Sequence, residues 1–464
     1  MHKIVHLDLK GAPLKLPFLE QVLKYIKKCG ATGILIEWED SFPYRGEIVD
    51  IGSNADASGD GMYSIEEVRY IFQCAKENEL EVIQLVQTIG HMEFVLKHPV
   101  YRKLQEKPRT PAVLCPSQQN SQGLVRAMVQ QVLNVQPDAK YFHIGADEVW
   151  HTAFCIQCQY RAVSSKFGKL CLYLEHIRDL ALFIKQQRPD LTVLLWDDMM
   201  RSTPAEVLQY YKLGELVQPV VWDYNVKPHF HISPQLWENY RMLFPSVWVG
   251  SAFKGANGSC KVYPNENRYM SNQEAWIDEV NNNRHKVDFV GVILTGWSRY
   301  DHFATLCELL VVSMGCLREC LRLWNKYLDT NYTTQVNEPT TVTEADVTPG
   351  HELVQHMQCF EMFRERSEKL IQSDILATWM NPWQVEHGYT CPAQLEIIAN
   401  ESVMLIRQLT ALREIFVRQL AAITGVRSTK EWLGTFIAPL LNKLTDIQDV
   451  AITRYNLDAS VRPI

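Results

Sequence analysis

Short apolar segments rich in β-branched residues recur along roughly the first 300 positions of the chain. Their starts lie about 26 to about 60 residues apart, which leaves room for a helical crossover between successive strands. The eight segments are 4–9, 33–37, 82–87, 141–145, 192–196, 217–222, 247–252 and 289–295. Strands that are apolar on both faces and alternate with helices indicate a parallel sheet covered by helices.

The segments between these strands carry helical signals. Residues 17–29 repeat apolar side chains at every third or fourth position before a glycine. Ser64 and Glu67 form a capping-box pattern, which predicts a helix that continues to about Glu77. Residues 169–187 have the same helical spacing and are followed by a proline.

Eight strands is the number that closes a barrel, so we predict an α/β fold with a (β/α)8 TIM barrel over residues 1–328. An open, doubly wound sheet is the alternative, because a sequence does not show whether a sheet closes. Residues 10–13, which follow the first strand, lack the glycine spacing of a phosphate-binding loop, and this favours the barrel.

The pattern changes in the last third of the chain. Residues 329–350 are rich in Thr, Asn, Pro and Val without periodicity, which predicts a linker or long loop. Residues 351–373 and 392–423 have strong helical spacing, so 351–464 is predicted to form a C-terminal α-helical domain. This domain carries no polar cluster that suggests chemistry, and we expect a scaffold or a homodimer interface.

Charge and composition exclude several classes of protein. The 46 Lys and Arg against 53 Asp and Glu give a net charge of −7 without a basic block, so we expect no nucleic-acid partner. The sequence contains no charge-free run of about 18–20 apolar residues, so we expect no membrane-spanning helix. The first residues lack the apolar core of a secretory signal, which predicts a protein of the cytosol, or of cytosol and nucleus, that is not secreted.

The 12 cysteines are scattered along the chain, which is typical of reduced thiols in a protein core. Cys155 and Cys158 have the spacing of half a zinc site, but no second pair at ligand spacing follows them. We therefore do not expect a zinc site at this pair, and we also predict no cofactor for the protein.

Acidic and aromatic residues gather where the predicted strands end, and barrel enzymes place their catalytic side chains there. These residues include Asp8, Lys10, Glu37, Gln87, His91, His143, Asp147, Glu148, Trp196, Asp197, Asp198, Trp222, Asp223, Tyr224 and Trp297. Indole rings stack on the apolar faces of a pyranose, while carboxylates accept hydrogen bonds from its hydroxyls. The combination indicates a sugar site.

Asp147 and Glu148 are adjacent, so their Cα atoms lie about 3.8 Å apart at one strand end. They cannot easily flank a glycosidic bond, where two carboxylates stand about 5–5.5 Å or 6.5–9.5 Å apart. A 2-acetamido group of the substrate can replace the second carboxylate as nucleophile. Glu148 is then the general acid and later the base, with a raised pKa, and Asp147 orients the acetamide.

The segment His143-Ile144-Gly145-Ala146-Asp147-Glu148 resembles the H-x-G-x-D-E signature of glycoside hydrolase family 20, the β-N-acetylhexosaminidases. The resemblance continues through 6–13, 85–94, 196–199, 221–224, 251–256 and 294–302, and covers about residues 1–315. It is closer to non-lysosomal members of the family than to lysosomal ones.

The resemblance implies a barrel, retention of configuration, no metal and exo-acting removal of terminal β-linked GalNAc or GlcNAc from a glycoconjugate. It implies that Asp147 holds the acetamide and that Glu148 protonates the leaving group. The residues expected to bind substrate are Lys10, His91, His143, Trp196, Asp198, Trp222, Tyr224 and Trp297.

The chain departs from the family pattern at three places. Lys10 stands where other members carry an arginine that grips the sugar hydroxyls. Residues 251–254 lack the tyrosine that binds the acetamide oxygen, and Tyr224 is our substitute. The eighth strand lacks the usual sugar-binding glutamate, and Arg299 or Asp301 stands nearby.

Two other functions are compatible with the strand-end residues. A metal-dependent barrel hydrolase would use as ligands His6, Asp8, His91, His143 and Asp197. The usual His-x-His pair on the first strand is missing, however, and the tryptophans would have no role. A catalytically inactive barrel that binds amino sugars is the other alternative, and the intact Asp147–Glu148 pair argues against it.

Overall fold

The computed structural model describes residues 1–52, 61–329 and 348–461. Within it the chain divides into two compact units, Met1–Pro349 and Gly350–Ile464. Most of the predicted linker, 329–350, lies outside the described residues.

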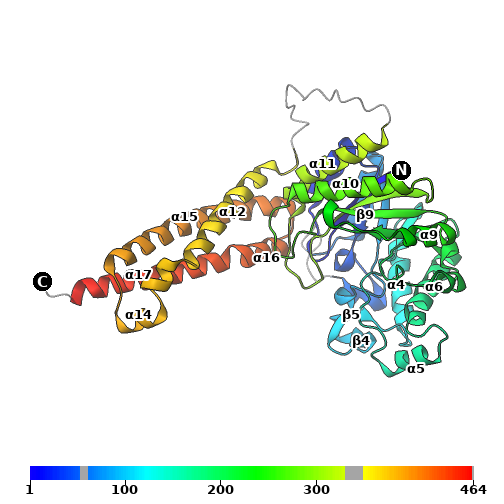
Figure 1. The fold of residues 1–464 in the computed structure, drawn as a ribbon, viewed down its shortest axis with the longest axis horizontal. Coiled ribbons are helices and arrows are strands. Elements are labelled where there is room, and N and C mark those ends of the chain that lie inside the picture. The colour runs from blue at the N-terminus through cyan, green and yellow to red at the C-terminus, as the bar shows by residue number, and fades with distance from the viewer. Residues whose placement is uncertain (53–60, 330–347, 462–464) are drawn as a thin grey trace. The chain divides into compact units, whose positions relative to one another are not determined.

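The first unit contains a closed barrel of parallel strands, which confirms the predicted fold class (Figure 1). Its strands are β1 (His2–Asp8), β2 (Gly33–Glu37), β3 (Glu81–Leu85), β6 (Tyr141–His143), β7 (Thr192–Trp196), β8 (Val217–Trp222), β9 (Val247–Lys254) and β10 (Phe289–Gly296). They follow one another around the barrel in chain order, and β10 pairs with β1 from Gly291 opposite His2 onward. This closure excludes the open sheet.

Helices follow the strands as the periodicity predicts. The α-helices of this unit are α1 (Leu16–Lys28), α2 (Ile65–Glu77), α3 (Glu93–Leu96), α4 (Ser121–Asn134), α5 (Ile156–Ser164), α6 (Leu170–Gln187), α7 (Ala205–Tyr210), α8 (Leu213–Leu216), α9 (Pro234–Leu243), α10 (Glu266–Asn283) and α11 (Leu310–Leu328). The predicted capping box opens α2: the Glu67 amide donates to Ser64 Oγ at 3.1 Å, and the Ser64 amide donates to Glu67 Oε2 at 2.7 Å. Together these bonds satisfy two amides that the first helical turn leaves unpaired.

The remaining elements of this unit lie in the connections between strands. Short 3-10 helices occupy η1 (Glu39–Ser41), η2 (Gly46–Ile51), η3 (Pro99–Leu104) and η4 (Lys227–His229). After β3 and α3 the chain forms an antiparallel hairpin of β4 (Gln105–Lys107) and β5 (Thr110–Leu114). The sequence pattern did not predict this hairpin, because its first strand is short and polar.

The barrel interior is filled by fully buried side chains from most of its strands. They are Ile4, Leu35, Ile83, Leu85, Leu194, Trp196, Val220, Trp248 and Ile293. Trp222 and Trp297 pack partly buried against this cluster, nearer the carboxyl ends of the strands. A densely packed core of this kind holds the carboxyl ends of the strands in fixed positions.

The second unit is helical, as predicted. It consists of α12 (His351–Ile371), α13 (Asp374–Trp379), α14 (Pro382–His387), α15 (Pro392–Ile423), α16 (Val426–Phe436) and α17 (Ala438–Val461). Phe360, Phe416 and Trp432 join α12, α15 and α16 through edge-to-face contacts between rings 5.1–6.1 Å apart. Among the described residues of either unit, no helix combines the length and apolar composition that a membrane span requires.

Candidate active site

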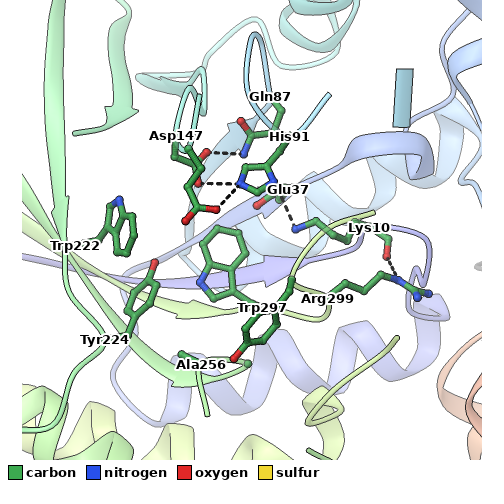
Figure 2. Close-up of a pocket in the computed structure, with 13 residues that line it drawn as sticks. Lys10, Glu37, Gln87, His91, Asp147, Trp222, Tyr224, Ala256, Trp297 and Arg299 are labelled. Atoms are coloured by element: carbon green, nitrogen blue, oxygen red, sulfur yellow. Dashed lines mark hydrogen bonds and ion pairs between the residues drawn. The ribbon is translucent and has the colours of Figure 1, made fainter. Parts of the chain in front are cut away.

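A pocket of about 210 Å³ opens at the carboxyl ends of the barrel strands (Figure 2). It is lined by Lys10, Glu37, Gln87, His91, Asp147, Glu148, Trp222, Tyr224, Gly255, Ala256, Trp297, Arg299 and Tyr300. Residues from seven of the eight strand ends or their following loops meet here, so the barrel assembles the pocket from distant parts of the chain.

The loop after β6 carries the two adjacent acids. Ala146 (φ +72°) and Glu148 (φ +51°) both have left-handed backbone, a strained conformation for residues with a side chain. Two side chains fix this turn. Gln87 Oε1 accepts from the Ala146 amide at 3.1 Å, and Asp198 Oδ2 accepts from the Glu148 amide at 2.9 Å. The strained turn places Asp147 and Glu148 side by side in the pocket wall.

His91 bridges the two acids. Its Nε2 lies 3.2 Å from Glu148 Oε2 and 3.5 Å from Asp147 Oδ2, and its backbone is also left-handed (φ +49°). Burial disfavours the charged imidazolium, but Asp147 and Glu148 outweigh this and raise the pKa of His91 to about 10. His91 is therefore a cation at neutral pH, shared between two carboxyl groups.

The two acids have pKa shifts of opposite sign. Burial raises the pKa of Asp147, whose Oδ1 also accepts from Gln87 at 3.1 Å. The hydrogen bond from His91 lowers the pKa of Glu148 despite partial burial. The sequence-based expectation that Glu148 itself has a raised pKa is wrong for this state, because the sequence gave no sign that His91 would contact it.

A buried charge cluster forms the floor beside the acids. Lys10 Nζ lies 3.1 Å from Asp8 Oδ2 and 3.4 Å from Glu37 Oε1, and 4.9 Å from the centre of the Trp297 ring. Burial disfavours the ammonium, but the neighbouring carboxylates raise the pKa of Lys10. Burial likewise disfavours ionised Glu37, but Lys10 and a 3.0 Å contact to His6 Nε2 lower its pKa. The floor thus carries fixed charges of both signs.

Aromatic rings form the opposite wall. Tyr224 stacks on Trp222 with ring centres 5.1 Å apart, and Trp222 Nε1 donates to Asp198 at 3.3 Å. Figure 2 shows Tyr224 between Trp222 and Trp297, with its hydroxyl directed toward the side on which Asp147 lies. A flat apolar wall that faces carboxylates suits a pyranose, which has both apolar faces and a hydroxyl rim.

The structure brings most of the predicted site residues together. Those that line the pocket are Lys10, His91, Asp147, Glu148, Trp222, Tyr224 and Trp297. His143 and Trp196 are fully buried below it, with their rings 4.5 Å apart, and Trp196 supports Trp297 at 5.9 Å. His143 Nδ1 accepts from the Gly145 amide at 2.9 Å. Asp198 acts from behind the wall, through the bonds to Glu148 and Trp222.

Sequence reasoning noted some lining residues without giving them a role, and missed others. Glu37 and Gln87 were recognised only as strand-end residues, and their partners Lys10 and Ala146 are visible only in the fold. Arg299 donates to the Lys10 carbonyl at 3.1 Å and fixes the loop after β1. The other lining residues without a predicted role are Gly255, Ala256 and Tyr300.

The residues proposed for a metal-dependent hydrolase do not converge. Asp197 pairs with Arg201 at 2.7 Å, Asp8 with Lys10, and His143 with a backbone amide. Within the ranges that the structure describes, neither group of potential metal ligands contains any of these residues. The ligand set predicted for the metal-hydrolase alternative is therefore not assembled among the described residues.

Comparisons with known proteins agree with this geometry. Residues 43–230 match the family model "Glycosyl hydrolase family 20, catalytic domain". Hexosaminidase D of Homo sapiens is 34% identical over 458 residues, which cover 95% of this chain and 92% of that protein. The chain belongs to glycoside hydrolase family 20. The predicted family is thus confirmed.

Other family 20 proteins extend the comparison. Hexosaminidase D of Bos taurus is 40% identical over 321 residues, which cover 69% of this chain and 91% of that protein. The crystal structure of β-N-acetylhexosaminidase from Bacteroides fragilis NCTC 9343 matches with a TM-score of 0.50 and 15% identity, over 69% of this chain and 65% of that one. This likeness shows that the two share a fold.

Replacing Gly90 by alanine is expected to disturb the packing between the loop of His91 and the loop of Asp147 and Glu148. An added Cβ would lie 2.0 Å from the backbone oxygen of Asp147, so one of the two loops must move. Overpacking of this kind costs about 1–3 kcal/mol, and it would displace either His91 or the acids. We expect lower stability in urea unfolding together with lower kcat.

Gly123 provides the matched control for this substitution. It lies in α4 with no atom within 4 Å of an added Cβ, and Gly to Ala in a helix contributes about 0.5–1 kcal/mol. Gly123→Ala should therefore keep full activity. Unchanged stability and turnover in Gly90→Ala would show that the packing between the two loops is not tight.

Proposed function

We propose that this glycoside hydrolase is an exo-acting, retaining β-N-acetylhexosaminidase that removes terminal β-linked GalNAc or GlcNAc by substrate-assisted catalysis. The observation that carries the proposal is the Asp147–Glu148 pair in one wall, faced by Trp222, Tyr224 and Trp297. The other lining carboxylate, Glu37, is paired with Lys10 and His6 in the floor. A nucleophile supplied by the substrate is consistent with this arrangement.

In the first step, the acetamide oxygen attacks the anomeric carbon as the glycosidic bond breaks. Asp147, ionised and buried, accepts the acetamide N–H and stabilises the positive charge of the oxazolinium that forms. The Tyr224 hydroxyl donates to the acetamide oxygen and aligns it. Glu148 gives its proton to the departing oxygen.

In the second step, water attacks the anomeric carbon from the face that the leaving group vacated. Glu148, now ionised, takes a proton from this water, and the oxazolinium opens to restore the acetamide. Two inversions at the same carbon give net retention. The buried floor formed by Lys10 and Glu37 closes the pocket below one sugar unit, which suits a terminal residue.

Before the sugar binds, His91 holds the proton for the first step. Glu148 is the more exposed acid, with 38% of its side chain accessible, against 8% for Asp147. A bound sugar covers Glu148 and so disfavours the negative charge of its carboxylate. The acetamide N–H donates to Asp147 and replaces the interaction that Asp147 loses when His91 gives up its proton. The proton then moves over the 3.2 Å from His91 Nε2 to Glu148 Oε2.

The test is release of a fluorescent aglycone from the β-N-acetylglucosaminide, the β-N-acetylgalactosaminide and the plain β-glucoside. We expect turnover of an acetamido sugar and none of the glucoside, with the β-anomer appearing first in proton NMR. Inhibition by a thiazoline analogue of the oxazolinium would support the intermediate. Equal turnover of the glucoside, or release of the α-anomer, would reject substrate assistance, and binding without turnover would favour the inactive sugar-binding barrel.

Location and partners stay predictions of the sequence alone. These are a protein of the cytosol, or of cytosol and nucleus, a glycoconjugate substrate, no nucleic-acid partner, and a homodimer through residues 351–464.

A further inference from the structure

Four potential metal ligands from three segments meet outside the sugar pocket. Glu106 belongs to β4, and Cys115 directly follows β5. Cys155 is the residue before α5, and Cys158 lies in the first turn of that helix. One ligand atom from each lies within 4.8 Å of the other three. Cys115 and Glu106 complete the half-site that the Cys155–Cys158 spacing suggests.

The distances fit a tetrahedral centre. Cys115 Sγ lies 3.4 Å from Cys155 Sγ and 3.5 Å from Cys158 Sγ. In a tetrahedral zinc site, Zn–S bonds of about 2.3 Å place the sulfurs about 3.8 Å apart. Small outward movements of these side chains would therefore accommodate an ion at the centre.

Glu106 gives independent evidence for a ligand at this position. Its side chain is fully buried, and its Oε1 accepts from the amides of Phe154 at 2.7 Å and Cys155 at 3.2 Å. Its Oε2 is buried, and the groups that face the carboxylate beside the sulfurs are the thiols of Cys115 and Cys158, which are weak hydrogen-bond donors. A buried carboxylate that receives only weak donors is costly, and a cation would satisfy it better.

The surroundings suit thiolates bound to a cation. The Cys158 amide donates to Cys155 Sγ at 3.3 Å, and both sulfurs lie at the N-terminus of α5, where the helix dipole favours negative charge. Arg161 on the same helix donates to Ser117 Oγ at 2.8 Å, and Ser117 Oγ lies 2.9 Å from Cys158 Sγ. These groups offset part of the ligands' negative charge.

We propose that Glu106, Cys115, Cys155 and Cys158 bind a structural zinc ion. Three soft thiolates and one carboxylate favour Zn²⁺ over Mg²⁺ or Ca²⁺, which prefer oxygen ligands. The ion would join the β4–β5 hairpin, which follows His91 in the chain, to the loop that carries Asp147 and Glu148. The proposal does not depend on the identity of the sugar.

Metal analysis of the full-length protein, purified with a reducing agent and without chelator, tests this. We expect about one zinc ion per chain, resistant to brief EDTA treatment and released when a mercurial reagent blocks the thiols. Cobalt reconstitution should give the intense visible bands of a tetrahedral site together with a thiolate-to-cobalt charge-transfer band. The wild-type measurement does not depend on how any variant folds.

Variants then assign the ligands. Cys158→Ser and Glu106→Gln should lower the zinc content and the Tm, and Cys158→Ser should retain less than about a tenth of the metal. Cys74→Ser changes a buried thiol on α2 and should retain all of it. Three results would overturn the proposal. The first is wild-type protein that contains no zinc while its thiols react freely, the second is an intact mass two hydrogens lower because of a disulfide, and the third is full zinc content in Cys158→Ser.

Discussion

Replacing Glu148 by glutamine is expected to lower kcat by about 10²–10⁴-fold, the usual contribution of a general acid. Glutamine has nearly the same shape, and the hydrogen bond that the backbone amide of residue 148 donates to Asp198 does not involve the side chain. The turn should therefore persist while the transferable proton is lost. The measurement compares kcat for an aryl glycoside, which has a good leaving group, with kcat for an alkyl glycoside.

The dependence on the leaving group separates this role from a structural one. Glu148→Gln should lose most on the alkyl glycoside, because that leaving group needs the proton. Asp147→Asn is the comparison, since it removes the charge that stabilises the oxazolinium and should lose a similar factor on both substrates. If Glu148→Gln loses the same factor on both substrates, or loses nothing, the acid assignment is wrong.

Much of the fold could be predicted because the barrel strands are buried on both faces. Such strands read as continuous apolar runs, and all eight predicted runs contain or overlap a barrel strand. The β4–β5 hairpin escaped prediction because Gln105-Glu106-Lys107 has neither apolar character nor a clear alternation. Its buried glutamate is understandable only from the contacts of Glu106 with the loop before α5.

The candidate site was predictable to the extent that strand ends meet at one rim of a barrel. This rule located Asp147, Glu148, Trp222 and Trp297, all of which line the pocket. It could not separate lining residues from those below them: Trp196 ends β7 like a pocket residue, yet it is fully buried in the core. Which way a strand-end side chain points depends on the barrel, since successive residues face opposite sides.

The least predictable part of the site was which side chains contact one another across distant parts of the sequence. The His91 contacts reverse the expected pKa shift of Glu148, although His91 and Glu148 are far apart in the chain. In the same way, Cys115 is separated from Cys155 by a helix and a strand, so cysteine spacing alone could not indicate the cluster. Such partners need the tertiary fold.

Replacing His91 by glutamine is expected to move the alkaline limb of the kcat/KM profile to lower pH. In the wild type, the His91–Glu148 pair keeps one proton until the pH approaches the pKa of His91, about 10. Glutamine removes the imidazolium, so the cause that lowers the pKa of Glu148 disappears and that pKa rises. Glu148 alone nevertheless loses its proton at a lower pH than the pair, so the alkaline limb moves down.

This shift distinguishes a proton store from a positioning residue, because loss of positioning lowers kcat/KM at every pH without moving the limb. The profile is measured with the alkyl glycoside, whose leaving group needs the proton, from pH 4 to about 11, so that it spans the pKa of His91, about 10. His151→Gln changes a histidine that lies on the loop of Glu148 but does not line the pocket, and it should leave the limb unchanged. Coincident limbs for wild type and His91→Gln would mean that Glu148 receives its proton directly from water, and that His91 only holds the two carboxylates together.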